Sequence, residues 1–238
     1  EPGAELLRSG NLTGRPYRGQ LVVIPTAVDF KAFSMSDESG GDSELAAVRS
    51  WVGGGLLLGW VGSINRWYNT DASLSIVRRV LDRLPNARLL CLTQQREEME
   101  SALTPHNLGH ASRVVSVSHG EIPRWVRELD WGLQIMGTSR AKAASMPTKF
   151  AEFIASGVRP IHHGCNDEVT SWVERCGTGY NLPDLSDAAL DSCATHIATS
   201  ASSPEERASA RSRLESHFSL DAASRQYQAL YNTILRDD

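Results

Sequence analysis

The sequence predicts an α/β fold built on a doubly wound parallel sheet and followed by C-terminal helices. Strand-like and helix-like segments alternate between residues 56 and 182, which is the pattern of such a sheet. The strand-like segments lack polar alternation, as in residues 56–61 (Leu-Leu-Leu-Gly-Trp-Val), so we expect helices to cover the sheet on both faces. Residues 188–235 have helical patterning almost throughout.

The elements are expected in a regular order along the chain. Residues 21–24 (Leu-Val-Val-Ile) predict a short strand that ends at Pro25, and the Ser-, Gly- and Asp-rich residues 34–44 predict a linker or surface loop. Three glycines at 53–55 predict a turn before the sheet. Strands are then expected near residues 56–61, 88–93, 113–117, 132–136, 159–162 and 179–182. Helices are expected near residues 71–84, 97–103, 121–130, 147–157, 168–175, 188–198, 204–218 and 222–235.

Composition excludes several classes of protein. The 238 residues carry 24 basic and 28 acidic side chains, so the basic surplus of a nucleic-acid-binding protein is missing. No apolar run is long enough to predict a transmembrane segment, and the first residues lack the pattern of a signal peptide. Without paired metal spacing, the four cysteines are expected to be reduced thiols of a cytoplasmic protein. They are Cys91, Cys165, Cys176 and Cys193.

Residues 145–157 are the most informative segment. Pro147 suits the first helical position and Gly157 suits the end of a helix. The free N–H groups of the first turn, at Thr148, Lys149 and Phe150, would attract a phosphate at this helix N-terminus. Ser145, just before the helix, could add a hydroxyl donor.

Lys149 and Glu152 are three residues apart and therefore share one face of that helix. We expect Lys149 to bind a diphosphate and Glu152 to bind the hydroxyls of a ribose, as in a nucleoside-diphosphate ligand. Phe150, Phe153 and Ile154 can point into a core. The alternative is a capped core helix with two solvated charges.

Other candidate residues follow the ends of predicted strands, where doubly wound folds bind ligands. Gly62 and Ser63 follow the first strand of the sheet, and Gly62 would allow the backbone to approach a ligand. Arg66 is a possible second cation for the diphosphate, or a solvated side chain. Trp67 could stack on a base, or pack. Backbone groups of residues 116–119 could recognise a base edge.

Three segments, taken in order, resemble a known enzyme family. Residues 22–29 (Val-Val-Ile-Pro-Thr-Ala-Val-Asp) resemble the end of the first domain of GT-B glycosyltransferases of the family 4 type. Residues 58–64 (Leu-Gly-Trp-Val-Gly-Ser-Ile) are similar to the first strand and glycine loop of their second domain. Residues 145–157 are similar to the Ser-Pro-Thr-Lys-x-x-Glu segment of that domain.

The resemblance implies a Rossmann-like C-terminal domain that binds a nucleotide-sugar donor without metal or cofactor. It makes residues 1–33 the remnant of an acceptor domain and the start of a linker, residues 34–55 the rest of the linker, and residues 56–238 the donor domain. The donor-binding residues it implies are Gly62, Ser63, Arg66, Ser145, Thr148, Lys149 and Glu152.

The resemblance also implies the reaction, a hexosyltransferase-like transfer that retains the anomeric configuration. The acceptor site would belong to the missing N-terminal domain, so this chain alone would bind the donor without turnover. The full-length protein could also touch a membrane at its surface. No catalytic residue is assigned.

One departure from the family keeps other functions open. The family often carries two Glu residues eight positions apart; Glu152 fills the second place, but Ala144 stands at the first. One alternative is a degenerate, non-catalytic module that contacts a partner protein through Tyr227, Leu230 and Tyr231 of the last helix. Another is a nucleotide-sugar epimerase of related fold, although the acids and histidines it needs do not form a cluster in the sequence.

Overall fold

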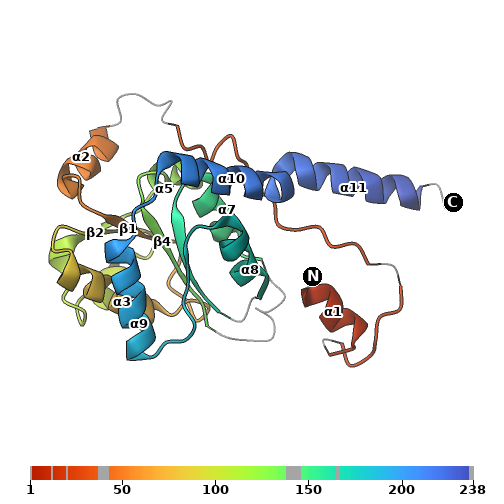
Figure 1. Ribbon diagram of the computed structural model, residues 1–238, viewed down its shortest axis with the longest axis horizontal. Coiled ribbons are helices and arrows are strands. Elements are labelled where there is room, and N and C mark those ends of the chain that lie inside the picture. Colours follow the sequence, from red (N-terminus) through yellow and green to blue (C-terminus); the bar gives the residue numbers. More distant parts are fainter. Residues whose placement is uncertain are drawn as a thin grey trace.

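Six parallel strands form one sheet in the order β3-β2-β1-β4-β5-β6 (Figure 1). The structure is a computed structural model that describes residues 2–11, 13–19, 21–36, 43–137, 146–164 and 167–235. The strands are β1 (Leu57–Val61), β2 (Arg88–Leu92), β3 (Ser112–Val115), β4 (Trp131–Ile135), β5 (Arg159–His163) and β6 (Tyr180–Asn181). The chain moves outward from β1 to β3, then returns to β4 and moves outward on the other side. This is the doubly wound α/β fold that the sequence predicts.

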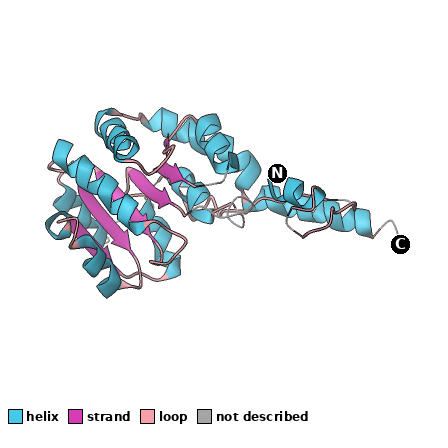
Figure 2. Cartoon of the chain, turned by 90° about the horizontal axis from the view of Figure 1, so that it is seen from below, coloured by secondary structure: helices cyan, strands magenta, loops and turns pink. Residues whose placement is uncertain are grey.

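Helices cover both faces of the sheet (Figure 2). Successive strand residues alternate between two cores: Leu58 and Trp60 pack with α3 (Thr70–Arg83), α4 (Arg96–Leu103) and α9 (Asp187–Thr199). Leu57 and Val61 pack on the other face, with α2 (Ser43–Val52) and α5 (Ile122–Val126). This double coverage explains why the strands are apolar throughout.

A third core lies beside the sheet. It contains α7 (Thr148–Ala155), α8 (Asp167–Cys176) and α10 (Pro204–Phe218). Phe150 and Ile154 of α7 are buried in this core, and Phe153 is buried in the core under β1. The prediction that these three side chains point inward is therefore confirmed.

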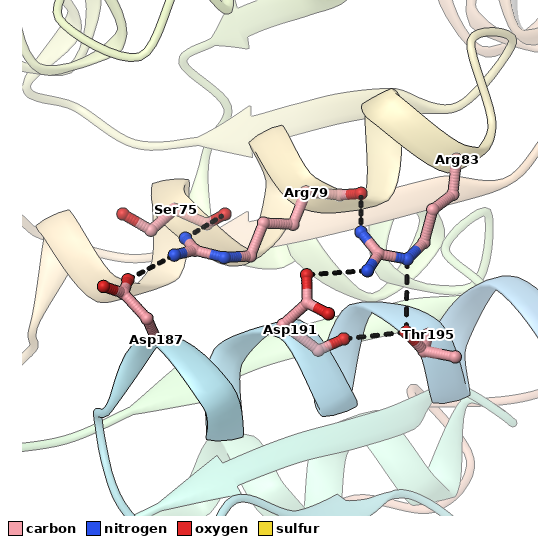
Figure 3. A network of polar contacts seen from close by, with 6 residues as sticks. All are labelled: Ser75, Arg79, Arg83, Asp187, Asp191 and Thr195. Carbon is pink, nitrogen blue, oxygen red and sulfur yellow. Dashed lines mark hydrogen bonds and ion pairs between the residues drawn. The ribbon is translucent and has the colours of Figure 1, made fainter.

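Polar contacts fix α9 on α3 (Figure 3). Arg79 pairs with Asp187, and Arg83 donates to the Asp191 carboxylate at 2.6 Å. Arg83 Nε also donates to the hydroxyl of Thr195 at 3.2 Å. Because the acidic partners are well exposed, each pair contributes little stability, and together they set the register of the two helices.

The N-terminal region differs from the predicted pattern. Residues 21–24 form no strand: Val22 and Val23 are half exposed and pair with no strand of the sheet. The first contacts with the body follow this segment: the hydroxyl of Thr26 donates to the carbonyl of Met146 at 3.2 Å, and the N–H of Val28 donates to the carbonyl of Phe218 at 2.8 Å. The N-terminal helix α1 (Pro2–Arg8) lies away from the sheet (Figure 1).

Arg211 of α10 fastens residues 30–33 to the α/β body. Its guanidinium donates to the carbonyls of Phe30 and Phe33, each at 2.6 Å, and to the carbonyl of Ala155 at the end of α7. Phe30 and Phe33 are buried in the third core. Burial lowers the pKa of the Arg211 guanidinium, which the three carbonyl oxygens help to solvate.

Residues 34–55 were predicted as a linker and turn; the prediction was wrong for Ser43–Val52, which form the helix α2, and residues 53–55 form a turn as predicted. Leu45 and Val48 are buried against the sheet, and Arg49 forms a bidentate pair with Glu128 at 2.6 and 2.7 Å.

Pro147 also lies one residue outside α7, at the N-cap position. Two short 3-10 turns, η1 (Gly109–Ala111) and η2 (His119–Glu121), were not predicted.

The final helix α11 (Leu220–Ile234) extends beyond the body (Figure 1). Ala222 and Ala223 are buried at its start, whereas its second half is open. Tyr227, Tyr231, Ile234 and Leu235 all expose about half of their surface or more, from 49% to 72%. Within the described ranges, no helix has the length and apolar character needed to cross a membrane.

Candidate functional site

A pocket of about 440 Å³ opens at the carboxyl ends of β1 and β2. The direction of winding reverses between β1 and β4, so the crossovers on either side leave a crevice at this edge of the sheet. The walls come from five regions: the β1 and β2 ends, residues 117–122, the first turns of α7, and Phe33. The lining residues are Phe33, Val61, Gly62, Ser63, Leu92, Thr93, Gln94, Gln95, Val117, His119, Ile122, Thr148, Lys149 and Glu152.

The N-terminus of α7 forms one wall. Pro147 at the N-cap is extended and its side chain has no acceptor for the N–H groups of the first turn. These N–H groups have no acceptor within the helix and, with the helix dipole, give this end a partial positive charge. Thr148 and Lys149 of this turn both line the pocket. The wall is therefore suited to an anion.

Lys149 extends from α7 toward the end of β1. Its Nζ lies 3.9 Å from the centre of the Tyr68 ring, a cation–π contact that orients the ammonium. Tyr68 is itself fixed, because it forms an isolated bridge with Met136 and its ring meets Trp60 edge-on. The loop after β1 thus carries an aromatic support for the cation.

Glu152 is half buried one turn further along α7. Burial raises the pKa of its carboxyl group, and the charges of Lys149 and His119 partly oppose this rise. Burial also raises the pKa of Tyr68, with a smaller contribution from Glu152. An acidic acceptor and a cation therefore face one pocket, where a ligand could use both a hydroxyl donor and an anionic group.

Hydrogen bonds hold the far wall in place. Gln94 Nε2 donates to the carbonyl of Val117 at 2.7 Å, and Gln95 Oε1 accepts the N–H of Ile64 at 2.7 Å. The carbonyl of Val117 is therefore already engaged. The wall combines this amide pair with the apolar side chains of Val117 and Ile122, an arrangement that can receive a flat ring.

Five of the seven residues proposed from the sequence line this pocket: Gly62, Ser63, Thr148, Lys149 and Glu152. Arg66 is not among the lining residues. Its guanidinium lies over the Trp67 ring at 4.7 Å, and both side chains are exposed. Ser145 lies outside the described residues. Within the described part of the chain, no group of three His, Cys, Asp or Glu side chains could hold a metal ion.

Sequence reasoning missed several lining residues. Gln94 and Gln95 directly follow β2, so the rule that selected Gly62 at the end of β1 could have selected them. Phe33 and the supporting Tyr68 gave no comparable signal, because their positions depend on contacts far along the chain. Val117 and His119 belong to residues 116–119, which the sequence did suggest.

Comparison with known structures establishes the fold. A glycosyltransferase from Rickettsia africae is 14% identical, with a TM-score of 0.70, over 99% of this chain and 63% of that one. Anabaena Alr3699/HepE in complex with UDP and glucose is 12% identical, with a TM-score of 0.67, over 97% and 62%. The pneumococcal O-GlcNAc transferase GtfA in complex with UDP and GlcNAc is 14% identical, with a TM-score of 0.64, over 97% and 43%.

These likenesses confirm the GT-B type of fold that the sequence resemblance predicts. No protein-family model matches the chain, and no curated protein matches its sequence. The chain spans less than two thirds of the length of the structures it resembles.

Proposed function

We propose that this chain is the donor-binding part of a glycosyltransferase that uses a nucleoside-diphosphate sugar. One observation carries the proposal: the N-terminus of α7, Lys149 and Glu152 line a single pocket at the switch point of the sheet. The UDP named with two of the similar structures supports a uridine nucleotide as the first ligand to test.

Each part of the ligand has a complementary wall. The diphosphate would lie at the first turn of α7 beside Lys149, and the ribose hydroxyls would donate to Glu152. The base would lie between Val117, Ile122 and the Gln94 amide. Gly62 would let the ligand approach the end of β1.

The chemistry proposed is transfer of a hexose with retention of configuration, without metal or cofactor. As the bond to the sugar breaks, negative charge develops on the departing diphosphate. The α7 N-terminus and Lys149, both fixed in advance, would stabilise that charge. Arg66 could join them only if it left the Trp67 ring.

Residues 56–238 would form the donor domain, and the segment before them would lead from an acceptor domain. The acceptor domain would correspond to the part of the similar structures that this chain does not span. On this proposal the 238 residues bind the donor but do not transfer its sugar.

Thermal unfolding of the purified chain with UDP, GDP, ADP and CMP tests the proposal. A ligand at a hundredfold excess over its dissociation constant adds about 2.7 kcal/mol to the stability. We expect one nucleoside diphosphate to raise the melting temperature and CMP to have less effect. If none of the four binds in calorimetric titration at millimolar concentration, the donor-site assignment is wrong.

A second function is favoured by α11, whose exposed apolar side chains would suit a partner protein. In that case the chain would be a non-catalytic GT-B-like module. Such a module would bind no nucleotide, so the same titrations separate the two functions.

A further inference from the structure

A second pocket, of about 200 Å³, lies at the opposite edge of the sheet. It is formed where β4 and β5 begin, at the neighbouring residues Trp131 and Arg159. The other walls are the loop of residues 177–179, His196 near the end of α9, and the residues that lead into α10. A strand of five residues separates the two edges, so the two pockets lie roughly 16 Å apart.

Arg159 is the central feature of this pocket because it is a buried charge without an acidic partner. Only 6% of its surface is exposed. Within the described residues the single hydrogen bond of its guanidinium runs from Nη1 to the carbonyl of Ser200, at 3.0 Å, and no carboxylate forms an ion pair with it. Its Nε is buried without a hydrogen-bond partner. Burial lowers the pKa of this guanidinium, and the negative charges of Asp130 and Glu206 partly oppose the fall.

The groups around Arg159 leave the charge only partly balanced. The guanidinium lies 4.1 Å from the centre of the Trp131 ring, and its acceptor Ser200 is the C-cap residue of α9. Glu206 lines the same pocket, but its carboxylate accepts the N–H of Ser203 at 2.9 Å in the capping box of α10. A buried cation usually forms an ion pair with an anion, and no described carboxylate forms one with Arg159.

The remaining wall suits a polar ligand. The imidazole of His196 meets the Trp131 ring edge-on at 5.8 Å and makes no hydrogen bond to any described residue. Burial, and then the charge of Arg159, lower the pKa of His196, so at neutral pH its imidazole is uncharged and offers one donor and one acceptor. In the facing loop, Gly177 and Gly179 have no side chain and Thr178 has a short one that lines the pocket.

We propose that this pocket binds a small oxyanion, a phosphate or carboxylate group, on Arg159. The anion would pair directly with the guanidinium through charge-assisted hydrogen bonds, whereas the carboxylates of Asp130 and Glu206 act on it without forming an ion pair. His196 would donate a further hydrogen bond. The site is independent of the nucleotide pocket, and it stands whether or not the proposed glycosyl transfer is correct.

The whole chain, titrated with inorganic phosphate and followed by NMR of the indole N–H groups, tests this site. The Trp131 resonance, assigned with Trp131→Phe, should shift saturably with phosphate but not with chloride at equal ionic strength. In Arg159→Met the apparent dissociation constant should rise roughly tenfold or more. In Lys149→Ala, which alters only the other pocket, it should be unchanged.

A second variant keeps the test decisive if Arg159→Met does not fold. Thr178→Asp adds a carboxylate to the pocket wall while Arg159 remains in place. It should weaken phosphate binding, whereas Thr178→Asn should leave it intact. Absence of a saturable shift in the wild-type chain would overturn the proposal. So would equal binding by Thr178→Asp and Thr178→Asn, or loss of binding in Lys149→Ala.

Discussion

The ammonium of Lys149 occupies the space that a side chain at residue 62 would need. A Cβ at Gly62 would lie 2.5 Å from Nζ and 3.0 Å from Cε of Lys149, well inside van der Waals contact. The backbone of Gly62 also has φ of +110°, a conformation that residues with a side chain rarely adopt. Glycine is therefore favoured at this position for two reasons: its backbone adopts the positive φ, and its missing side chain leaves space for the Lys149 ammonium.

Replacement of Gly62 with alanine should displace the Lys149 ammonium and strain the end of β1. We expect nucleotide affinity to fall by about tenfold, or ~1.4 kcal/mol, and stability to fall by about 1–3 kcal/mol. Calorimetric titration and urea unfolding measure the two effects. Gly109→Ala is the matched control, because a Cβ there would meet nothing within 4 Å. Equal affinity in wild type and Gly62→Ala would contradict the placement of the ligand.

Lys149→Ala should weaken binding of a nucleoside diphosphate by roughly ten- to a hundredfold, since it removes a charge-assisted contact of about 1.5–3 kcal/mol. Binding of the nucleoside without phosphates should change little. The comparison separates a phosphate contact from general damage to the pocket. Lys31→Ala removes the same charge from an exposed site and serves as the control for net charge.

Glu152→Gln should change the pH dependence of stability. Burial raises the pKa of Glu152 in the folded chain above its unfolded value of about 4.3. The folded state therefore binds the proton more tightly, and this contribution to stability is present below the unfolded pKa and is lost as the pH rises through the folded pKa. Glutamine stays neutral, so the variant should gain stability over the wild type as the pH rises through that window.

Thermal melts of both proteins measure this difference between about pH 4 and pH 8, a range that covers the titration of Glu152. Glu174→Gln, at an exposed position on α8, is the control and should show no such trend. Nucleotide affinity should change in the opposite direction to stability: Glu152→Ala should weaken binding, by a few kcal/mol at most, because hydrogen bonds to the ligand are lost. Unchanged affinity would remove Glu152 from the site.

Arg211→Met should destabilise the chain by about 2–3 kcal/mol, because it leaves three backbone carbonyls without their donor. It should also weaken nucleotide binding, since Phe33 lines the pocket and is held by this contact. Urea unfolding and titration measure the two effects. Arg225→Met changes an exposed arginine of α11 and should be neutral; a similar loss in both variants would mean that the carbonyl contacts contribute nothing specific.

Much of the fold could be predicted because its strands are short apolar runs between recognisable helices. The helix α2 was missed because the Ser-, Gly- and Asp-rich residues before it and the three glycines after it have the composition of a linker, although Leu45 and Val48 have helical spacing. Residues 21–24 have the composition of a strand but form none, since their apolar character alone does not provide a neighbouring strand.

The site was predictable where the chemistry is local to one element. Lys149 and Glu152 are brought together by helical spacing, and Gly62 by its place after a strand. Phe33 is held at the same pocket by the third core and by Arg211, which is 178 residues further along the chain. No local pattern specifies such a contact. Arg66 also follows a strand in the sequence, yet its guanidinium lies over the Trp67 ring and not in the pocket.

The contact between Arg211 and Phe33 also determines when the pocket can be completed during synthesis. The residues of the sheet and of α7 leave the ribosome before those of α10, because synthesis proceeds from the N-terminus. Phe33 can make its contact with Arg211 only after α10 has been made, and Val28 can pair with the carbonyl of Phe218 only at the end of that helix. A ribosome stalled before residue 211 would therefore carry a chain whose pocket lacks this contact, so ligand binding should emerge only after α10 has been made.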